Sequence, residues 1–142
     1  LPRWQVRGGG HLLVTASAAG LLTNLGDAPY SATKHAAVGL AEWLAITHGD
    51  DGLKVSCLCP QGVRTPMLMG GIDAGEESAK VVELMGIVEP SLVADVVVDG
   101  LRDERFLILP HPEVAEYQVN KATSPDRWIG GMRKLQRRLT GS

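Results

Sequence analysis

The fold is decided by His11-Leu-Leu-Val-Thr-Ala-Ser17, Leu53-Lys-Val-Ser-Cys-Leu-Cys59 and the stretch 30–47 between them. The first run is apolar, partly β-branched and does not alternate, which is typical of a strand buried on both faces. Over 30–47, apolar residues recur at helical spacing, and Gly49-Asp-Asp-Gly52 ends the helix. A strand, a long helix and a second strand predict a βαβ unit with parallel strands.

Beyond this unit, the sequence predicts further helices and one further strand. We expect one more short strand over residues 105–109. We also expect three helices, over residues 76–85, 91–101 and 113–139, with the last helix broken at Ser124-Pro125. Residues 18–29 and 61–75 are rich in small or turn-forming residues and are predicted as loops.

The predicted fold class is α/β: a partial doubly wound (Rossmann-like) parallel sheet of about three strands with flanking helices. Three strands are few for such a sheet, so we expect one unprotected edge and missing N-terminal strands. The chain begins with Leu1 rather than Met, and we interpret it as a processed, truncated or engineered segment.

The composition excludes several classes of protein. The 142 residues are 44% hydrophobic, which is enough for a core, and carry 14 Lys and Arg against 16 Asp and Glu. With a net charge of -2, the chain has no excess of basic residues that would bind nucleic acid or an anionic membrane. No apolar run approaches the roughly 18 residues of a membrane span. We therefore expect a cytoplasmic protein.

Polar side chains follow the ends of both strands of the βαβ unit. Ser17 ends the first strand, and Tyr30 and Lys34 begin the crossover helix. Ligands of open α/β sheets bind outside the carboxyl ends of the strands, and residues four apart share one helix face. A lysine charge beside a phenol favours the phenolate, which suits the phenol to proton transfer, and a nearby serine hydroxyl would hold the same substrate oxygen.

These residues sit in a recognisable pattern. Ser17-Ala-Ala-Gly20, Tyr30-Ser-Ala-Thr-Lys34 and Pro60-Gln-Gly-Val-Arg-Thr65, each at its place in the strand-helix-strand order, together resemble the short-chain dehydrogenase/reductase family. The resemblance covers residues 8–109. It implies that Tyr30 is the general acid/base, that Ser17 holds the reacting oxygen, and that Lys34 binds the nicotinamide ribose and favours the phenolate.

The same resemblance implies a nicotinamide cofactor, NAD or NADP, whose nicotinamide end is lined by Tyr30, Lys34, Pro60, Gly62, Val63 and Thr65. The family's usual Pro-Gly reads Pro60-Gln61 here, which puts contacts at Gln61 in question. The Gly-rich pyrophosphate turn of the family's N-terminal half is not found in the chain, so the adenine side of the cofactor site is absent from it.

Several other residues have two open interpretations. Leu22, Leu25, Met67, Leu68 and Met69 either line an apolar substrate pocket, with Leu22, Met67 and Leu68 as its main members, or simply pack a loop on the helix over 76–85. Trp43 lies on the crossover helix and either belongs to the family's dimer face or covers the core. Cys57 and Cys59 share one side of a strand and are interpreted as buried thiols, with no metal site.

We predict an NAD(P)-dependent oxidoreductase that interconverts a small-molecule alcohol and a carbonyl by hydride transfer. Residues 1–142 would form one partial domain, the C-terminal half of such a fold, with 61–89 as the substrate loop region and 112–142 as a helical tail. We expect a homo-oligomer or a missing N-terminal half as partner, and an inactive chain in isolation. The alternative is a non-catalytic remnant half-domain that acts through association with itself or a partner.

Overall fold

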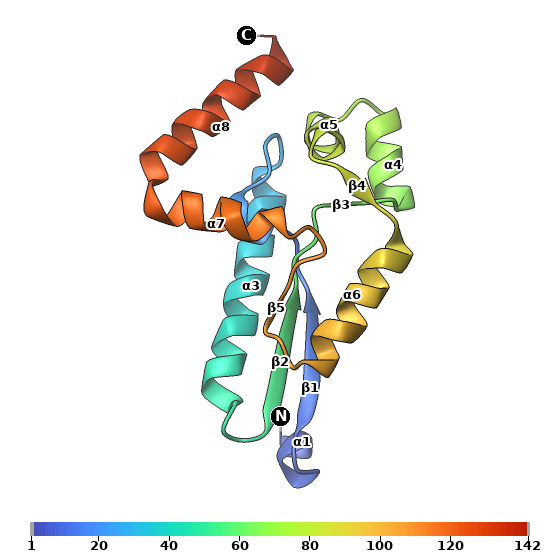
Figure 1. Cartoon of the computed structure of the whole chain (residues 1–142), viewed down its shortest axis with the longest axis vertical. Helices are drawn as coiled ribbons and strands as arrows, with labels where there is room; N and C mark the ends of the chain where they lie inside the picture. The colour runs from blue at the N-terminus through green and yellow to red at the C-terminus, as the bar shows by residue number, and fades with distance from the viewer. Residues whose placement is uncertain (1, 142) are drawn as a thin grey trace.

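The predicted βαβ unit forms the centre of the protein, whose computed structural model describes residues 2–141 (Figure 1). Strand β1 (Gly10–Thr15) leads through α3 (Ala28–His48) to β2 (Leu53–Leu58). The two strands pair in parallel, from Gly10 opposite Leu53 to Thr15 opposite Leu58. Strand β5 (Leu107–Ile108) pairs in parallel with the other side of β2, giving the order β1-β2-β5.

Helices cover both faces of this sheet. Helix α3 lies on one face and α6 (Pro90–Arg102) on the other (Figure 1). The third strand is shorter than the expected 105–109, because only Leu107 and Ile108 pair with β2. The core between α3 and the sheet is built from buried apolar side chains, among them Ala16, Leu21, Ala41, Leu53, Val55, Cys57 and Val114.

The prediction of a loop over residues 61–75 is wrong in part, because this stretch contains a strand and a helix. Strand β3 (Gly62–Val63) pairs in parallel with β4 (Ile87–Val88), and α4 (Pro66–Asp73) and α5 (Glu77–Leu84) lie between them in the chain. Thr65 caps α4 by accepting a hydrogen bond from the Leu68 backbone N–H at 3.3 Å, and Pro66 occupies the first turn.

The tail follows the prediction, with α7 (Glu113–Thr123) and α8 (Pro125–Thr140) separated at Ser124. The loop expected over 18–29 instead begins with the short helix α2 (Ala19–Leu22), and Lys121 of α7 donates from Nζ to the Leu21 carbonyl oxygen at 2.6 Å. A further short helix, α1 (Pro2–Val6), was not anticipated. Figure 1 shows α7 crossing the carboxyl end of the sheet and α8 standing away from it.

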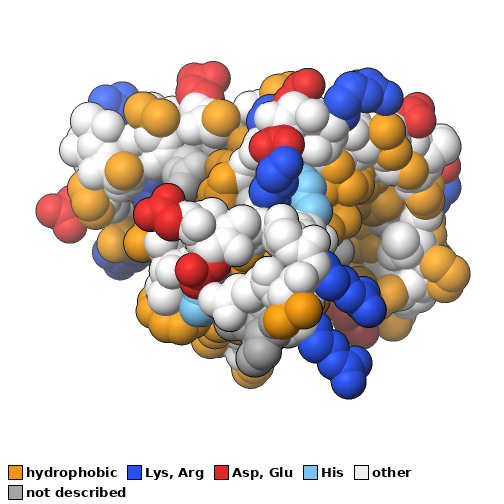
Figure 2. Space-filling view, turned by 90° about the horizontal axis from the view of Figure 1, so that it is seen from below, with side chains coloured by type: hydrophobic (Ala, Val, Ile, Leu, Met, Phe, Trp, Pro, Cys, Tyr) orange, Lys and Arg blue, Asp and Glu red, His pale blue; other side chains and the backbone are white. Residues whose placement is uncertain are grey.

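The surface carries mixed charge. Viewed from below, at the amino ends of the strands, acidic and basic side chains alternate with exposed apolar ones (Figure 2). None of the helices within residues 2–141 is both long enough and apolar enough to cross a membrane. Trp43 is 55% exposed on α3, so the interpretation that it covers the core is wrong.

Candidate active site

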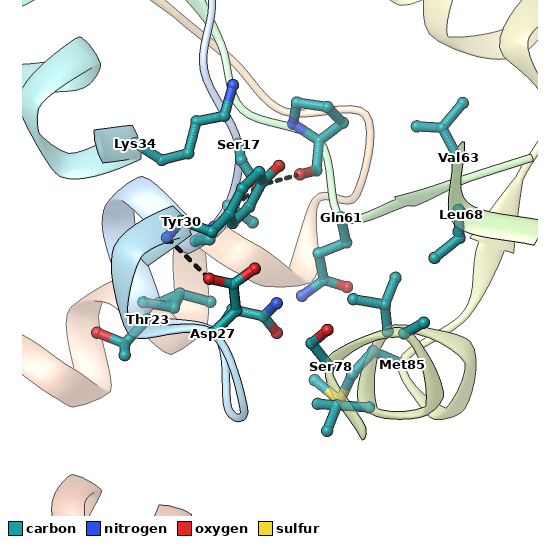
Figure 3. Close-up of a pocket in the computed structure, with 18 of the residues that line it drawn as sticks. Ser17, Thr23, Asp27, Tyr30, Lys34, Gln61, Val63, Leu68, Ser78 and Met85 are labelled. Atoms are coloured by element: carbon teal, nitrogen blue, oxygen red, sulfur yellow. Dashed lines mark hydrogen bonds between the residues drawn. The ribbon is translucent and has the colours of Figure 1, made fainter. Parts of the chain in front are cut away.

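A cavity of about 720 Å³ lies at the carboxyl ends of β1 and β2 (Figure 3). Its wall combines the segment after β1, the start of α3 and the segment after β2 with side chains from α4, α5, α7 and α8. The backbones after the two strands stay hydrogen-bonded, since Ala16 N–H donates to the Leu58 carbonyl oxygen and Ala18 N–H to that of Pro60, both at 2.8 Å. The cavity floor is therefore an extension of the sheet.

Ser17 is fixed at the end of the first strand. It is 9% exposed, its Oγ accepts a hydrogen bond from the Ala19 N–H at 3.1 Å, and its hydroxyl lies 3.5 Å from the Pro60 carbonyl oxygen as a donor. These contacts orient the hydroxyl at the junction of the two strand ends. The long second contact is weak, so the hydroxyl proton can turn toward a ligand.

Tyr30 is fixed by the start of α3. Asp27 is the N-cap, and its Oδ1 accepts a hydrogen bond from the Tyr30 backbone N–H at 2.9 Å, while Pro29 suits the first turn. One residue further, the buried Ser31 accepts from the Asn24 N–H at 2.8 Å and ties the preceding loop to the helix. The Tyr30 side chain is thereby held at the cavity, which Ser17 also lines (Figure 3).

Lys34 lies one helical turn after Tyr30, as the spacing predicts. Its Nζ is 5.4 Å from the centroid of the Tyr30 ring, in the arrangement of a cation over an aromatic face. Both side chains line the cavity together with Ser17. The structure thus brings the three residues that the sequence singles out into one site, with a hydroxyl, a phenol and an ammonium on the same wall.

The segment after β2 supplies the opposite wall. Pro60, Val63 and Thr65 line the cavity, and so does Gln61. Gly62 does not line the cavity, and its contribution to the cofactor site stays a prediction. A β-carbon on Gly62 would lie 2.7 Å from the Gly86 carbonyl oxygen, so this glycine serves the close packing of β3 against the segment before β4.

The apolar part of the wall agrees in part with the prediction. Leu22, Met67 and Leu68 line the cavity, whereas Leu25 and Met69 do not. The sequence analysis did not predict the contributions from distant elements, which include Val82, Met85, Val93, Trp128, Met132 and Leu135. The spacing of Trp128, Met132 and Leu135 on one face of a helix was the available signal.

Cys57 and Cys59 are buried free thiols, with their Sγ atoms 3.8 Å apart. The hydrogen bond that they share, together with burial, holds the pKa of Cys59 well above its usual value. Cys59 therefore stays protonated and weakly nucleophilic at neutral pH, although it lies close to Ser17.

His111 does not line the cavity but supports its wall at Gln61, a contact that the sequence analysis missed. It lies between Pro110 and Pro112 after the third strand, is 4% exposed, and accepts the backbone N–H of Gln61 on Nδ1 at 3.1 Å. Burial lowers the pKa of His111 below its ordinary 6.5, against the opposing charge of Glu113. The ring is therefore neutral at pH 7, with its proton on Nε2. Its position at the end of a third parallel strand was the signal for it.

Known proteins with similar sequences share parts of this chain. An uncharacterized NAD-dependent oxidoreductase of Mycobacterium tuberculosis is 43% identical over 60 residues, which cover 42% of this chain and 22% of that protein. The chain thus spans less than a quarter of the length of this relative.

Solved structures share the fold over more of the chain. A short chain dehydrogenase/reductase from Burkholderia phymatum in complex with NAD superposes with a TM-score of 0.73 at 24% identity, over 87% of this chain and 50% of that one. A short-chain dehydrogenase from Sphingobium yanoikuyae in complex with NADPH gives 0.67 at 22% identity, over 94% of this chain and 46% of that one. The parallel α/β sheet is therefore of the Rossmann-like type expected from the sequence. The model of the short chain dehydrogenase family matches residues 1–74, so the chain belongs to that family of oxidoreductases.

Proposed function

We propose that this chain carries the catalytic residues of an NAD(P)-dependent oxidoreductase that interconverts an alcohol and a carbonyl compound. The observation that supports this most directly is the meeting of Ser17, Tyr30 and Lys34 in one cavity at the carboxyl ends of parallel strands. A cofactor of the nicotinamide type is consistent with the NAD-dependent relative and with the NAD and NADPH complexes of the structural neighbours.

The residues present fit the nicotinamide end of such a cofactor. Lys34 has its Nζ beside Tyr30 on the cavity wall, where it would bind the ribose hydroxyls, while Pro60, Val63 and Thr65 would border the ring. When bound, the cofactor supplies or accepts the hydride. In this family the residues that select between NAD and NADP lie on the adenine side of the cofactor, outside the part of the chain that carries the resemblance.

In the reducing direction, Tyr30 gives its phenolic proton to the carbonyl oxygen as the hydride reaches the carbonyl carbon, and an alcohol results. Ser17 holds that oxygen through its hydroxyl and stabilises the charge that develops on it. The nearby ammonium of Lys34 stabilises the phenolate that remains until a proton is restored. Oxidation of the alcohol runs through the same groups in reverse, with Tyr30 accepting the hydroxyl proton.

Replacing the phenol tests the assignment. In the protein at its native length, Tyr30→Phe should lower the turnover of NADH or NADPH with ketones by about 10²–10⁴-fold, since general acid/base catalysis contributes that much. Cofactor affinity should stay close to that of the wild type. Tyr117→Phe removes a second phenol from the same cavity and serves as the matched control. Unchanged turnover in Tyr30→Phe would contradict the proposal.

One observation favours a second function, association without catalysis. Leu40, Trp43 and Ile46 form an exposed apolar stripe on α3, with exposed fractions of 58%, 55% and 78%. A second copy of the chain that packs on this stripe would bury it, as the expectation of a homo-oligomer requires. Turnover in a dimer would support the enzyme, whereas a dimer that binds neither NAD nor NADP would favour association alone.

A further inference from the structure

Gln61 is held rigidly beside the proposed catalytic residues. Its backbone N–H donates to Nδ1 of the buried His111 at 3.1 Å. The preceding carbonyl oxygen, that of Pro60, accepts the Ala18 N–H at 2.8 Å and faces the Ser17 hydroxyl at 3.5 Å. The peptide unit between Pro60 and Gln61 is therefore anchored through both its N–H and its C=O, and the Gln61 side chain starts from a fixed point close to Ser17.

The Gln61 side chain extends into the cavity (Figure 3). Its Oε1 is buried, and within residues 2–141 it has no hydrogen-bond partner. In native proteins the great majority of buried carbonyl oxygens accept a hydrogen bond, and leaving one without a donor is unfavourable for stability. The neighbouring wall is mostly apolar on this side, with Val63, Leu68 and Met85 lining the same cavity, and the hydroxyl group of Ser78 does not bond to this oxygen. An unpaired hydrogen-bond acceptor that faces a cavity in this way indicates a ligand with a hydrogen-bond donor.

Figure 3 also shows which side of the cavity the Gln61 side chain faces. The carboxamide points away from Lys34, which would bind the ribose, and toward Ser78 and Met85 at α5. A group bound there lies on the side of the cavity formed by the 61–89 region. This placement favours the substrate over the cofactor as the partner of Gln61.

We propose that Gln61 determines specificity, and that the substrate carries a hydroxyl group besides the carbonyl or alcohol that reacts. The inference rests on the proposed function for the location of the reacting group. The Gln61 carboxamide accepts a hydrogen bond from that second hydroxyl and, being uncharged, favours a neutral partner. The apolar walls bind the remainder of the molecule, so the substrate class is a hydroxylated, otherwise apolar ketone or the corresponding diol.

Matched ligand pairs test this without relying on turnover. The probes are ketones that differ by one hydroxyl group, such as 4-phenyl-2-butanone and 4-(4-hydroxyphenyl)-2-butanone, with further pairs that vary the distance between hydroxyl and carbonyl. Affinities are measured by calorimetry on the protein at its native length. The wild type should bind the hydroxylated member of at least one pair about tenfold more tightly or better. Gln61→Met, which is similar in size, should reduce that preference to about threefold or less.

A wild type without preference in any pair, or a preference that survives in Gln61→Met, would overturn the inference. So would a loss of NADH or NADPH affinity in Gln61→Met, because it would assign the carboxamide to the cofactor. If Gln61→Met does not fold, Gln61→Gly removes the same carboxamide without adding bulk and should show the same loss. Turnover of the ketones is recorded separately. Its absence counts against the proposed function, whereas the affinity ratios decide the role of Gln61.

Discussion

Gly20 packs directly against the backbone of Lys34. A β-carbon on Gly20 would lie 2.5 Å from the Lys34 carbonyl oxygen and 2.9 Å from Cγ2 of Val38. The short helix α2 therefore touches the turn of α3 that carries the lysine, and only a residue without a side chain permits this approach. The glycine of the Ser-Ala-Ala-Gly segment thus positions the lysine of the Tyr-x-x-x-Lys segment.

Gly20→Ala should separate the two helices. We expect a loss of about 1–3 kcal/mol in the free energy of unfolding, as for other overpacked sites, and lower turnover because Lys34 moves relative to Tyr30. Denaturant unfolding and steady-state kinetics measure the two effects. Gly39→Ala is the control: Gly39 lies on α3, the helix of Lys34, with open space around it, and the substitution should stabilise the protein by about 0.5–1 kcal/mol. Equal effects of both substitutions would contradict this account.

Asp27 should matter through the placement of Tyr30. Asp27→Ala removes the N-cap of α3 and should cost about 1 kcal/mol of stability. Because the capped N–H is that of Tyr30 itself, we also expect kcat to fall more than the substrate affinity. Asp27→Asn keeps an oxygen acceptor and should restore both quantities. A low kcat in Asp27→Asn would show that the carboxylate has another role.

Stability should depend on the protonation of His111. Its pKa is lowered in the folded state, so the unfolded chain binds the proton more readily. The neutral ring contributes its full stability above pH 6.5, and this contribution falls as the pH drops below 6.5 toward the lowered folded-state pKa. The limiting slope for one proton is about 1.4 kcal/mol per pH unit. Chemical denaturation between pH 5 and 8 measures it.

His111→Asn serves as the control for this titration, since its side-chain oxygen can accept the Gln61 N–H without binding a proton in this range. The difference in unfolding free energy between the wild type and His111→Asn should therefore vary with pH below 6.5 and be constant above it. A difference that is constant across the whole range would remove the assigned role of His111.

The exposed stripe of α3 should govern association. Trp43→Glu or Leu40→Glu should shift the protein to a smaller species in light scattering coupled to size exclusion, because a charge buried in an interface is unfavourable. Both positions lie away from the cavity, so cofactor binding should be retained. Glu42→Lys is an exposed change on the same helix and should leave the mass unchanged. A wild type that is already a monomer would argue against the interface.

Elements supported by long periodic patterns were predictable from the sequence. The βαβ unit, α6 and the break at Ser124 agree with the structure within a few residues, and the spacing of Tyr30 and Lys34 correctly placed both on one face of α3. Such elements depend on local hydrophobic periodicity and on capping residues, which a single sequence displays.

The remainder depends on contacts between distant residues. Strands β3 and β4 contribute two residues each and exist only because Gly62 and Val63 meet Ile87 and Val88. The four-residue α2 has no periodicity to detect, and its place is fixed by Lys121, a hundred residues further along the chain. The Gln61 contact with His111 likewise joins segments that no local pattern connects.

In the strand order β1-β2-β5, the two edges of the sheet differ in their capacity to pair with a further strand. On one side the sheet ends, within the described residues, in the six-residue β1, whose outward backbone groups can receive another parallel strand along their whole length. On the other side it ends in the two-residue β5, which offers almost no ladder. A strand supplied in trans would therefore be added next to β1, and a tethered or co-expressed strand-bearing segment could be used to build split versions of the site from two polypeptides.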